Sequence, residues 1–309
     1  MAINRRLLMG MAVATAGSMV LSSCAKNNDS SSGSSGSSSG AGTSTSVVVP
    51  SVTQQSAAAN VLPPKIKSSG KLIVAVNLPY APNEYKDSSG KIVGFDVDLM
   101  DATAKSLGLT ATYREATFDK IVPSVKAGTY DVGMSSFTDN KLREKTVDFV
   151  TYFKAGSQWA SAKGKQVDPN NACGLKVAVQ ATTVQDTDDI PARSKKCVAA
   201  KRKPITKLKF QSQAEATNAL VLGRVDAMAA DSPVTAYAVK QAGGKIALAG
   251  PIYDAAPYGW AVAKGSKLAS AMQKALQSLI GNGTYDKICK KWGVQAGEIK
   301  TSVINGATS

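Results

Sequence analysis

Two similar stretches of sequence, GTYDVGMSS at residues 128–136 and GRVDAMAAD at residues 223–231, decide the expected fold. Each follows a helical pattern, which for the second stretch runs over residues 213–222. In each stretch a glycine can end the helix in a left-handed conformation, and an aspartate three residues later opens a strand. We interpret this glycine and this aspartate as structural residues. Two such units, about 95 residues apart, predict two similar lobes.

The segments before the first of these units alternate between strand and helix patterns. The expected elements are a strand at 70–76, a helix opened by Asp96 with Leu99, Met100, Thr103 and Leu107 on its inner face and stopped by Gly108, a strand at 109–113, a helix at 120–126 and a strand at 131–135. Asp96 is the expected N-cap because a short carboxylate side chain can accept from the first free amides of a helix. The alternation predicts an α/β fold built from βαβ units, in which helices flank a mostly parallel sheet.

The ends of the two similar stretches are the expected place for a ligand. In open parallel sheets, ligands bind beyond the carboxyl ends of the strands. Ser136 and Asp231 stand at these ends, one in each predicted lobe. We therefore expect the two side chains to face each other across a cleft between the lobes.

Composition and charge exclude several classes of function. The 309 residues contain no histidine, which removes the commonest general base, the commonest zinc ligand and every Ser-His-Asp arrangement. We expect no catalytic residue, no metal site and no cofactor. The net charge is +15, but the lysines are scattered. The one dense run, at 195–203, has no interleaved aromatic residues for stacking bases, so we interpret it as a solvated face and expect no nucleic-acid partner.

The N-terminus has the zones of an export signal. Arg5 and Arg6 precede an apolar run at 7–21, and LSSC at 21–24 ends the segment. The apolar run is too short and too interrupted by Gly and Ser to span a membrane as a helix. The segment resembles a lipoprotein signal peptide, which implies removal of residues 1–23 and lipid attachment at Cys24. The alternative is an ordinary secretory signal with an incidental cysteine.

A tether and one disulfide are expected in the exported chain. Residues 24–60 are rich in Ser, Gly, Thr and Ala, so they offer too little apolar surface to offset the entropy of ordering. We expect them to be a disordered tether that holds the protein to the outer face of the cell membrane. Outside the cytoplasm, Cys173 and Cys197 are the expected disulfide, with Cys289 a buried free thiol. The sequence alone does not prove this pairing.

From about residue 61 to the C-terminus the chain resembles a known family, the polar amino-acid solute-binding proteins of ABC transporters, family 3. The segments that carry the resemblance are, in order, GFDVDL at 94–99, FD at 118–119 followed by IVP at 121–123, SSFT at 135–138 with Arg143 and VDF at 147–149, QATT at 180–183, GRVD at 223–226 with DSP at 231–233, PYG at 257–259 and GTYDKI at 283–288. The resemblance implies the type II periplasmic-binding-protein fold with two hinge crossovers. It places lobe 1 at 61–156 and 257–309, and lobe 2 at 157–256.

The resemblance also implies roles for individual residues. Arg143 would bind the α-carboxylate of an amino acid, because a guanidinium matches a carboxylate with two parallel hydrogen bonds. Asp231 would bind the α-ammonium. The remaining implied contacts are hydroxyl groups of Ser135, Ser136 and Thr138 from lobe 1, hydroxyl groups of Thr182 and Thr183 from lobe 2, the aromatic rings of Tyr80 and Phe118 around the ligand side chain, and Asn77, three residues before Tyr80.

Structural alternatives exist for several of these residues. Arg143 could form a surface salt bridge, Asp231 could cap the helix that starts near Pro233, and Tyr80 and Phe118 could be ordinary core. Relatives that bind basic or amide side chains often carry Asp at the position of Asn77, so a cationic ligand lacks an obvious partner here. Glu84 could bind an amine or be a rim charge. The sequence leaves the ligand side chain open.

The expected partners are therefore a free amino acid, an ABC permease and, through Cys24, the membrane. The protein is expected to be a monomer and not an enzyme. Two alternatives use the same fold. One is a cyclohexadienyl dehydratase-like enzyme, with Asp231 or Glu84 as its acid. The other is an extracellular sensor, which is disfavoured because no spanning segment follows Ser309.

Overall fold

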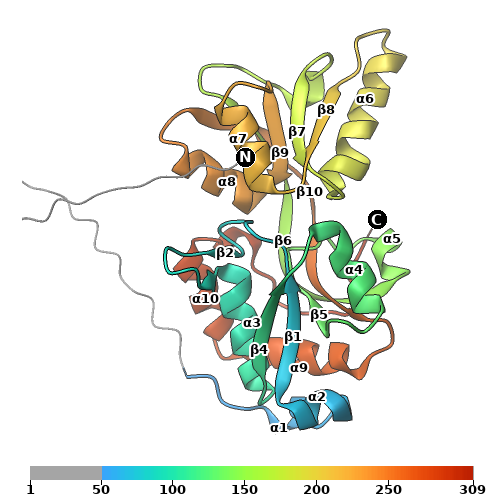
Figure 1. Cartoon of the computed structure of the whole chain (residues 1–309), viewed down its shortest axis with the longest axis vertical. Coiled ribbons are helices and arrows are strands. Elements are labelled where there is room, and N and C mark those ends of the chain that lie inside the picture. Colours follow the sequence, from blue (N-terminus) through green and yellow to red (C-terminus); the bar gives the residue numbers. More distant parts are fainter. Residues whose placement is uncertain (1–50, 309) are drawn as a thin grey trace, which may run out of the picture. The chain divides into compact units, whose positions relative to one another are not determined.

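The structure is a computed structural model that describes residues 51–308. The expected signal peptide at 1–23, the lipidation site Cys24 and most of the expected tether lie outside the described residues. The described part is an α/β structure with one large sheet in the order β4-β1-β5-β10-β6-β9-β7-β8 (Figure 1). The strands are β1 Lys71–Val76, β2 Tyr85–Lys86, β3 Ile92–Val93, β4 Thr110–Glu115, β5 Val132–Gly133, β6 Val147–Ala162, β7 Lys176–Gln180, β8 Thr206–Phe210, β9 Ala227–Asp231 and β10 Ile246–Ala263.

Helices pack against both faces of this sheet, as expected for βαβ units, since the neighbouring β1 residues Val74 and Ala75 belong to two different hydrophobic clusters. Those of the described residues are α1 Ser56–Ala59, α2 Pro64–Ser69, α3 Phe95–Ser106, α4 Phe118–Lys126, α5 Lys141–Glu144, α6 Ile190–Ala199 (preceded by a π-helical turn, Gln185–Asp189), α7 Gln213–Val221, α8 Ser232–Gln241, α9 Lys267–Gly281 and α10 Thr284–Trp292. None of these helices is both long and apolar enough to cross a membrane.

The sheet has two parallel parts, and two long strands join them. In one part β1 pairs in parallel with β4 and β5, and in the other β7 pairs in parallel with β8 and β9. β6 and β10 run antiparallel to each other from one part to the other (Figure 1). Their register shifts between Ala249 and Tyr253, and again between Tyr253 and Ala256. The two-lobed fold with two crossovers is thus confirmed.

The repeated glycine and aspartate have the same structural role in both lobes. Gly128 and Gly223 both follow a helix with positive φ angles, 74° and 68°, which glycine adopts without strain. The carboxylate of Asp131 accepts from the backbone N–H of Ile73 at 2.8 Å, and that of Asp226 accepts from the backbone N–H of Lys176 at 2.9 Å. Each aspartate therefore ties its own strand to the first strand of its lobe.

One local prediction was wrong. Gly94, not Asp96, is the N-cap residue of α3, and no side chain caps this helix. The Asp96 side chain is fully buried and its Oδ2 accepts from the Tyr152 hydroxyl at 2.7 Å and from the Ser136 hydroxyl at 2.9 Å. The Asp96 carboxylate therefore bonds to hydroxyl groups from distant segments instead of capping the helix, as the local sequence had predicted. Gly94 has a φ of 145° and lies so close to the Asn83 carbonyl that a Cβ would be 2.0 Å from its oxygen.

The end of the expected tether is ordered. Residues 24–60 were expected to be a tether, but α1 lies within this range, and Ala58 and Ala59 are 2% and 5% exposed within the main hydrophobic cluster. The backbone N–H of Gln55 also donates to the carbonyl of Ser106 at 2.7 Å. Small alanine side chains can pack closely against other helices, so composition alone does not reveal this contact.

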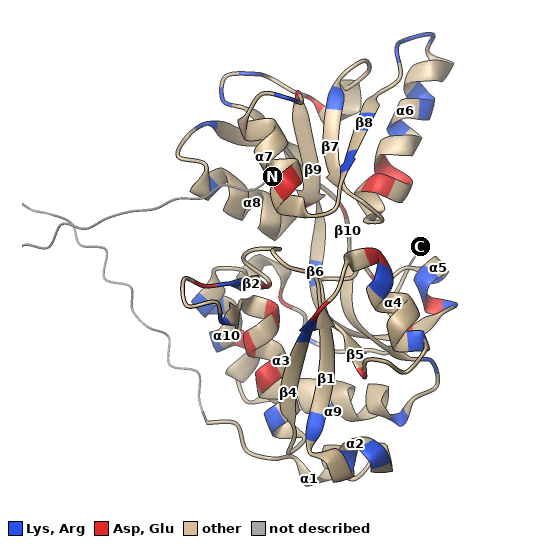
Figure 2. Cartoon of the chain, viewed as in Figure 1, with Lys and Arg blue, Asp and Glu red and all other residues tan. Residues whose placement is uncertain are grey.

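The described residues contain one disulfide and one free cysteine, and their positive charges are dispersed. Cys173 and Cys197 form a disulfide, and Cys289 is a buried free thiol in α10. Figure 2 shows Lys and Arg spread over both parts of the sheet and their helices rather than gathered on one face. Some of the lysines near the basic run are paired, since Lys207 Nζ lies 2.6 Å from a carboxylate oxygen of Asp186.

Candidate functional site

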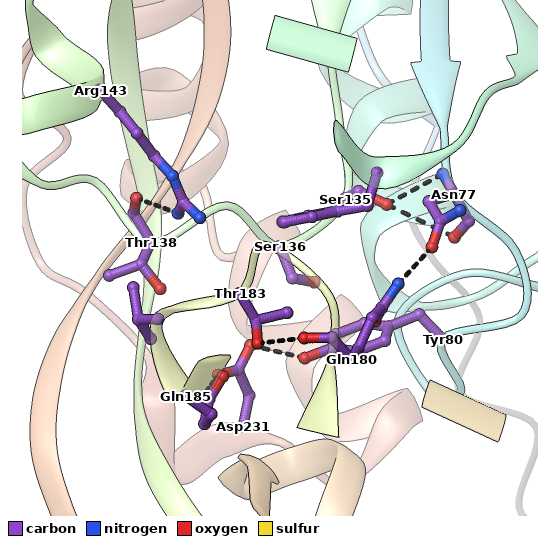
Figure 3. Close-up of a pocket in the computed structure, with 12 residues that line it drawn as sticks. Asn77, Tyr80, Ser135, Ser136, Thr138, Arg143, Gln180, Thr183, Gln185 and Asp231 are labelled. Carbon is purple, nitrogen blue, oxygen red and sulfur yellow. Dashed lines mark hydrogen bonds between the residues drawn. The ribbon is translucent and has the colours of Figure 1, made fainter. Parts of the chain in front are cut away.

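A small cavity lies at the carboxyl ends of the parallel strands (Figure 3). Asn77 directly follows β1, the serine pair 135–136 follows β5, Gln180 ends β7 and Asp231 ends β9. The lining residues are Asn77, Tyr80, Phe118, Ser135, Ser136, Thr138, Arg143, Gln180, Thr183, Val184, Gln185 and Asp231. Nine of the ten residues that the resemblance implies for ligand contact are among them. Thr182 is the exception.

Arg143 enters the cavity from α5, a short helix whose first turn is capped by Asn140 Oδ1. Its Nη1 donates to the Thr138 carbonyl at 2.8 Å, and its Nη2 donates to the Thr182 carbonyl at 3.1 Å. The guanidinium carbon lies 5.7 Å from the centre of the Phe118 ring. Burial lowers the pKa of Arg143, and the nearby Asp231 opposes this shift. A guanidinium held by carbonyls and aromatic rings keeps its charge and lacks a carboxylate partner within the described residues.

Asp231 is the acidic group of the cavity and is 7% exposed. It occupies the N-cap position of α8, but its side chain makes no cap hydrogen bond. Instead Oδ2 accepts from the hydroxyls of Tyr80 and Tyr258, both at 2.7 Å, and Oδ1 accepts from Gln185 Nε2 at 2.9 Å. Burial raises the pKa of Asp231, and these three donors oppose the shift. The Asp231 carboxylate therefore lines the cavity and does not cap α8.

The two predicted aromatic residues line the same cavity in different ways. Tyr80 is 6% exposed and its hydroxyl reaches across to Asp231. Phe118 begins α4 and stacks on Phe137, with ring centres 4.4 Å apart and planes 14° from parallel. Phe118 also belongs to the lining of the cavity. Its ring therefore both packs against a core residue and contributes to the site.

Two buried acidic residues, Glu84 and Asp96, accept hydrogen bonds from the cavity serines Ser135 and Ser136. Glu84 is 0% exposed, so it is not a rim charge, and its Oε1 accepts from the Ser135 hydroxyl at 2.7 Å. Asp96 Oδ2 accepts from the backbone N–H of Ser136, which has a φ of 51°. The Glu84 and Asp96 carboxyl groups are close enough to affect each other's pKa, and Glu84 Oε2 and Asp96 Oδ1 have no hydrogen-bond donor among the described residues. Burial, with its partner's charge, raises the pKa of Glu84 well above its usual value, and burial raises the pKa of Asp96 to about 6.

Three lining residues were not predicted: Gln180, Val184 and Gln185. Gln180 belongs to the QATT segment of the resemblance, so its position at a strand end was a usable signal. Its Nε2 donates to Asn77 Oδ1 at 2.7 Å. Gln185 Nε2 donates to Ser157 as well as to Asp231, a contact that brings three distant segments together and leaves no local sequence signal.

Thr182 is not among the residues that line the cavity. Its φ is 64°, and its backbone N–H donates to Asp186 Oδ2 at 2.9 Å. The left-handed backbone therefore presents its carbonyl to Arg143, while the neighbouring Thr183 lines the cavity. The hydroxyl-rich turn exists as expected, but the protein's own aspartate takes one of the amides that could have held an anion.

Four hydrogen bonds connect residues of the two lobes around the cavity: Gln180 to Asn77, Tyr80 to Asp231, Tyr258 to Asp231 and Arg143 to the Thr182 carbonyl. The space left between them is about 10 Å³ for the centre of a water-sized molecule, which is room for roughly one water. An amino acid can enter only when these contacts open. Among residues 51–308, no cluster of His, Cys, Asp or Glu has the arrangement of a metal site.

Fold and site together define a two-lobed binding protein with a polar cleft between its lobes. The chain belongs to the bacterial extracellular solute-binding proteins, family 3, whose family model matches residues 72–295. The resemblance seen in the sequence is thereby confirmed. The chain is a solute-binding protein of the amino-acid ABC transporter class rather than an enzyme.

Known proteins are similar to this chain over most of its length. The chain is 44% identical over 247 residues to the arginine-binding protein ArgT of Corynebacterium glutamicum, and the match covers 79% of this chain and 81% of that protein. It is 31% identical over 236 residues to the ABC transporter glutamine-binding protein GlnH of Bacillus subtilis, covering 74% and 82%. Among solved structures, an ancestral arginine-binding protein bound to arginine is similar, with 36% identity, a TM-score of 0.67 and coverage of 72% of this chain and 98% of that one.

Proposed function

We propose that the cavity binds both ends of a free amino acid, with the α-carboxylate on Arg143 and the α-ammonium on Asp231. The single observation that carries this proposal is that a guanidinium without a carboxylate partner and a buried carboxylate line the same small cavity. A zwitterion supplies the missing opposite charge to each group. Thr138, the serine pair 135–136 and Thr183 are proposed to add polar contacts, and Thr182 to act through its backbone.

We propose that the bound amino acid is arginine. The end of the cavity away from Arg143 offers the ring of Tyr80 and the side-chain amides of Asn77 and Gln180. A planar guanidinium can stack on an aromatic face and donate to amide oxygens, so a second carboxylate is not required. The proposal is further supported by the 44% identity to an arginine-binding protein. Glutamine, whose side-chain amide would fit the same groups, is the competing ligand.

Binding is proposed to occur by hinge closure between lobe 1 at 61–156 and 257–309 and lobe 2 at 157–256. In support, the register shifts of β10 against β6 lie next to these boundaries, and a Cβ on Gly156 would be 2.5 Å from the Tyr253 carbonyl oxygen. Opening would break the contacts that Tyr80 and Arg143 make with the other lobe. The ligand's ammonium and carboxylate would replace them, so closure would be favoured by the ligand's contacts with both lobes.

The attachment and delivery of the protein are also proposals. We propose that Cys24 carries a lipid, that the chain up to α1 is the tether, and that the monomeric closed form presents its ligand to an ABC permease. These rest on the LSSC segment at 21–24 and on the family. Changing Cys24 to Ala should release the protein from cells into the medium. Retention of the Cys24→Ala protein in the membrane fraction would refute the anchor.

Calorimetry with the twenty amino acids tests the site. Two charge-assisted hydrogen bonds of about 1.5 to 3 kcal/mol each predict that Arg143→Ala weakens arginine binding by roughly 10² to 10⁴-fold. Arg114→Ala is the matched control, because Arg114 is exposed and its side chain donates only to the carbonyl of its neighbour. An Arg143→Ala protein that binds as tightly as the Arg114→Ala protein would refute the carboxylate site.

A further inference from the structure

The C-terminal segment 302–307 lies outside the part of the chain that matches the family model, which ends at residue 295. It is nevertheless well packed. Ser302 is 0% exposed and its hydroxyl donates to the Thr151 carbonyl at 2.7 Å. The Thr151 N–H donates to the Val303 carbonyl at 2.9 Å, and the Phe149 N–H donates to Asn305 Oδ1 at 2.8 Å. The segment is therefore fixed along the first half of β6.

From there the segment reaches the loop that carries Arg143. The backbone N–H of Gly306 donates to Asp139 Oδ2 at 2.6 Å, and that of Ala307 donates to Glu144 Oε1 at 3.2 Å. These two acceptors are the residues at either end of the loop 139–144. A Cβ on Gly306 would be 2.9 Å from Thr151 Cγ2, so the close approach that allows these contacts depends on glycine.

Asp139 is the central contact of this arrangement. It is 2% exposed, and it lies between Thr138, whose carbonyl accepts from Arg143, and Asn140, whose side chain caps α5. The carboxyl groups of Asp139 and Glu144 also interact with each other, and Asp139 Oδ1 has no hydrogen-bond donor among the described residues. The loop is thus closed on itself and held from outside by two amides of the C-terminal segment.

We propose that residues 302–307 position Arg143 for ligand binding, through the contacts of Gly306 and Ala307 with Asp139 and Glu144. The segment does not touch the cavity, so its role is positioning rather than contact with the ligand. This inference rests on the proposed function of Arg143. It predicts that ligand affinity depends on a part of the chain beyond the residues that the family model matches.

Two changes test the proposal, with L-arginine as the probe, or L-glutamine if the wild-type protein binds it more tightly. A chain ending at Lys300 removes the segment, and a chain ending at Ala307 is its control because both amides remain. Asp139→Ala removes the acceptor of Gly306, whereas Asp139→Asn keeps an acceptor for Gly306 and gains a donor for Glu144. We expect about a tenfold loss of affinity for the Lys300 chain and for Asp139→Ala, and a loss of less than about twofold for Asp139→Asn and the Ala307 chain.

A variant that combines both changes distinguishes a role in positioning Arg143 from a general loss of structure. Because the segment and Asp139 act through one contact, Asp139→Ala should cause little further loss in the Lys300 chain. Additive losses, or unchanged affinity in both single variants, would overturn the proposal. If the Lys300 chain fails to fold, the affinities of Asp139→Ala and Asp139→Asn still test the proposal, and equal affinities would overturn it. If Arg143→Ala binds normally the proposed function fails, whereas normal binding by the Lys300 chain with a defective Arg143→Ala refutes only the positioning role.

Discussion

Replacing Glu84 by Gln should leave the protein stable at neutral pH. Glu84 Oε2 and Asp96 Oδ1 are buried without a hydrogen-bond donor among the described residues, and their two carboxyl groups interact. A proton between the two carboxyl groups would satisfy both atoms, and we expect Glu84 to carry it at neutral pH because burial raises the pKa of Glu84 well above its usual value. In the Glu84→Gln protein the amide N–H replaces this proton and the amide oxygen still accepts from the Ser135 hydroxyl.

The size of the effect follows from these contacts. We expect Glu84→Gln to change the free energy of unfolding by less than about 1 kcal/mol at pH 7. Glu84→Ala should cost about 3 to 5 kcal/mol, because it removes the short hydrogen bond of the Ser135 hydroxyl, leaves the buried Asp96 carboxyl group without its neighbouring acid, and opens a cavity. Glu115→Gln is the matched control, since Glu115 is half-exposed in its contact with Lys86 and should change little.

The pH dependence has a defined sign. Burial raises the pKa values of Glu84 and Asp96 in the folded state, that of Asp96 to about 6, so the folded protein holds protons that the unfolded chain releases. Stability is then greatest below the unfolded pKa values and falls as the pH rises toward the folded ones, by at most about 1.4 kcal/mol per pH unit for each proton. Glu84→Gln should show a flatter profile and exceed the wild type at alkaline pH.

Urea unfolding followed by tryptophan fluorescence between pH 5 and 9 measures this difference. Trp159 and Trp260 are fully buried, one in each lobe, so unfolding of either lobe changes the signal. The reasoning is refuted if Glu84→Gln is as unstable as Glu84→Ala at pH 7. Parallel pH profiles for wild type and Glu84→Gln would also refute it, because they would mean that Glu84 is ionised in the folded protein.

Two further predictions concern stability. Removing the disulfide with Cys173→Ser and Cys197→Ser together should lower the free energy of unfolding by about 3 kcal/mol, because it closes a loop of about 25 residues; urea midpoints that match the wild type would contradict this. Gly94→Ala should cost more than about 3 kcal/mol, since its Cβ would be 2.0 Å from the Asn83 carbonyl oxygen. Gly90→Ala, with positive φ but open space, is the control and should cost about 1 kcal/mol.

Much of the site could be predicted because it lies at strand ends. The alternation of strands and helices is a local property of the chain, and the carboxyl ends of parallel strands must meet at one edge of a sheet. Ser136 and Asp231 end equivalent strands, so their approach follows from the repeat at 128–136 and 223–231. The resemblance added Arg143, Tyr80 and the hydroxyl residues, and nine of its ten residues line the cavity.

Other features were decided by contacts between distant segments. Asp96 has the sequence context of a helix cap, yet its carboxylate accepts hydrogen bonds from the hydroxyls of Ser136 and Tyr152 instead. Burying a carboxylate without hydrogen-bond donors costs more free energy than leaving a helix without a side-chain cap. Gln185 reaches Asp231 from a segment 46 residues away. Neither contact has a periodicity or a spacing that could be seen in the sequence.

The sequence patterns by themselves determined the two lobes and the positions of Ser136 and Asp231 at strand ends, since strand and helix patterns repeat along the chain. The resemblance supplied the kind of site and its other residues. Only the tertiary structure decided that Glu84 is buried beneath the serines, that Thr182 offers its carbonyl instead of its hydroxyl, and that the C-terminal segment holds the Arg143 loop. The physical reason is that each of these depends on which buried polar group finds a partner, and the partners come together only when the lobes have folded.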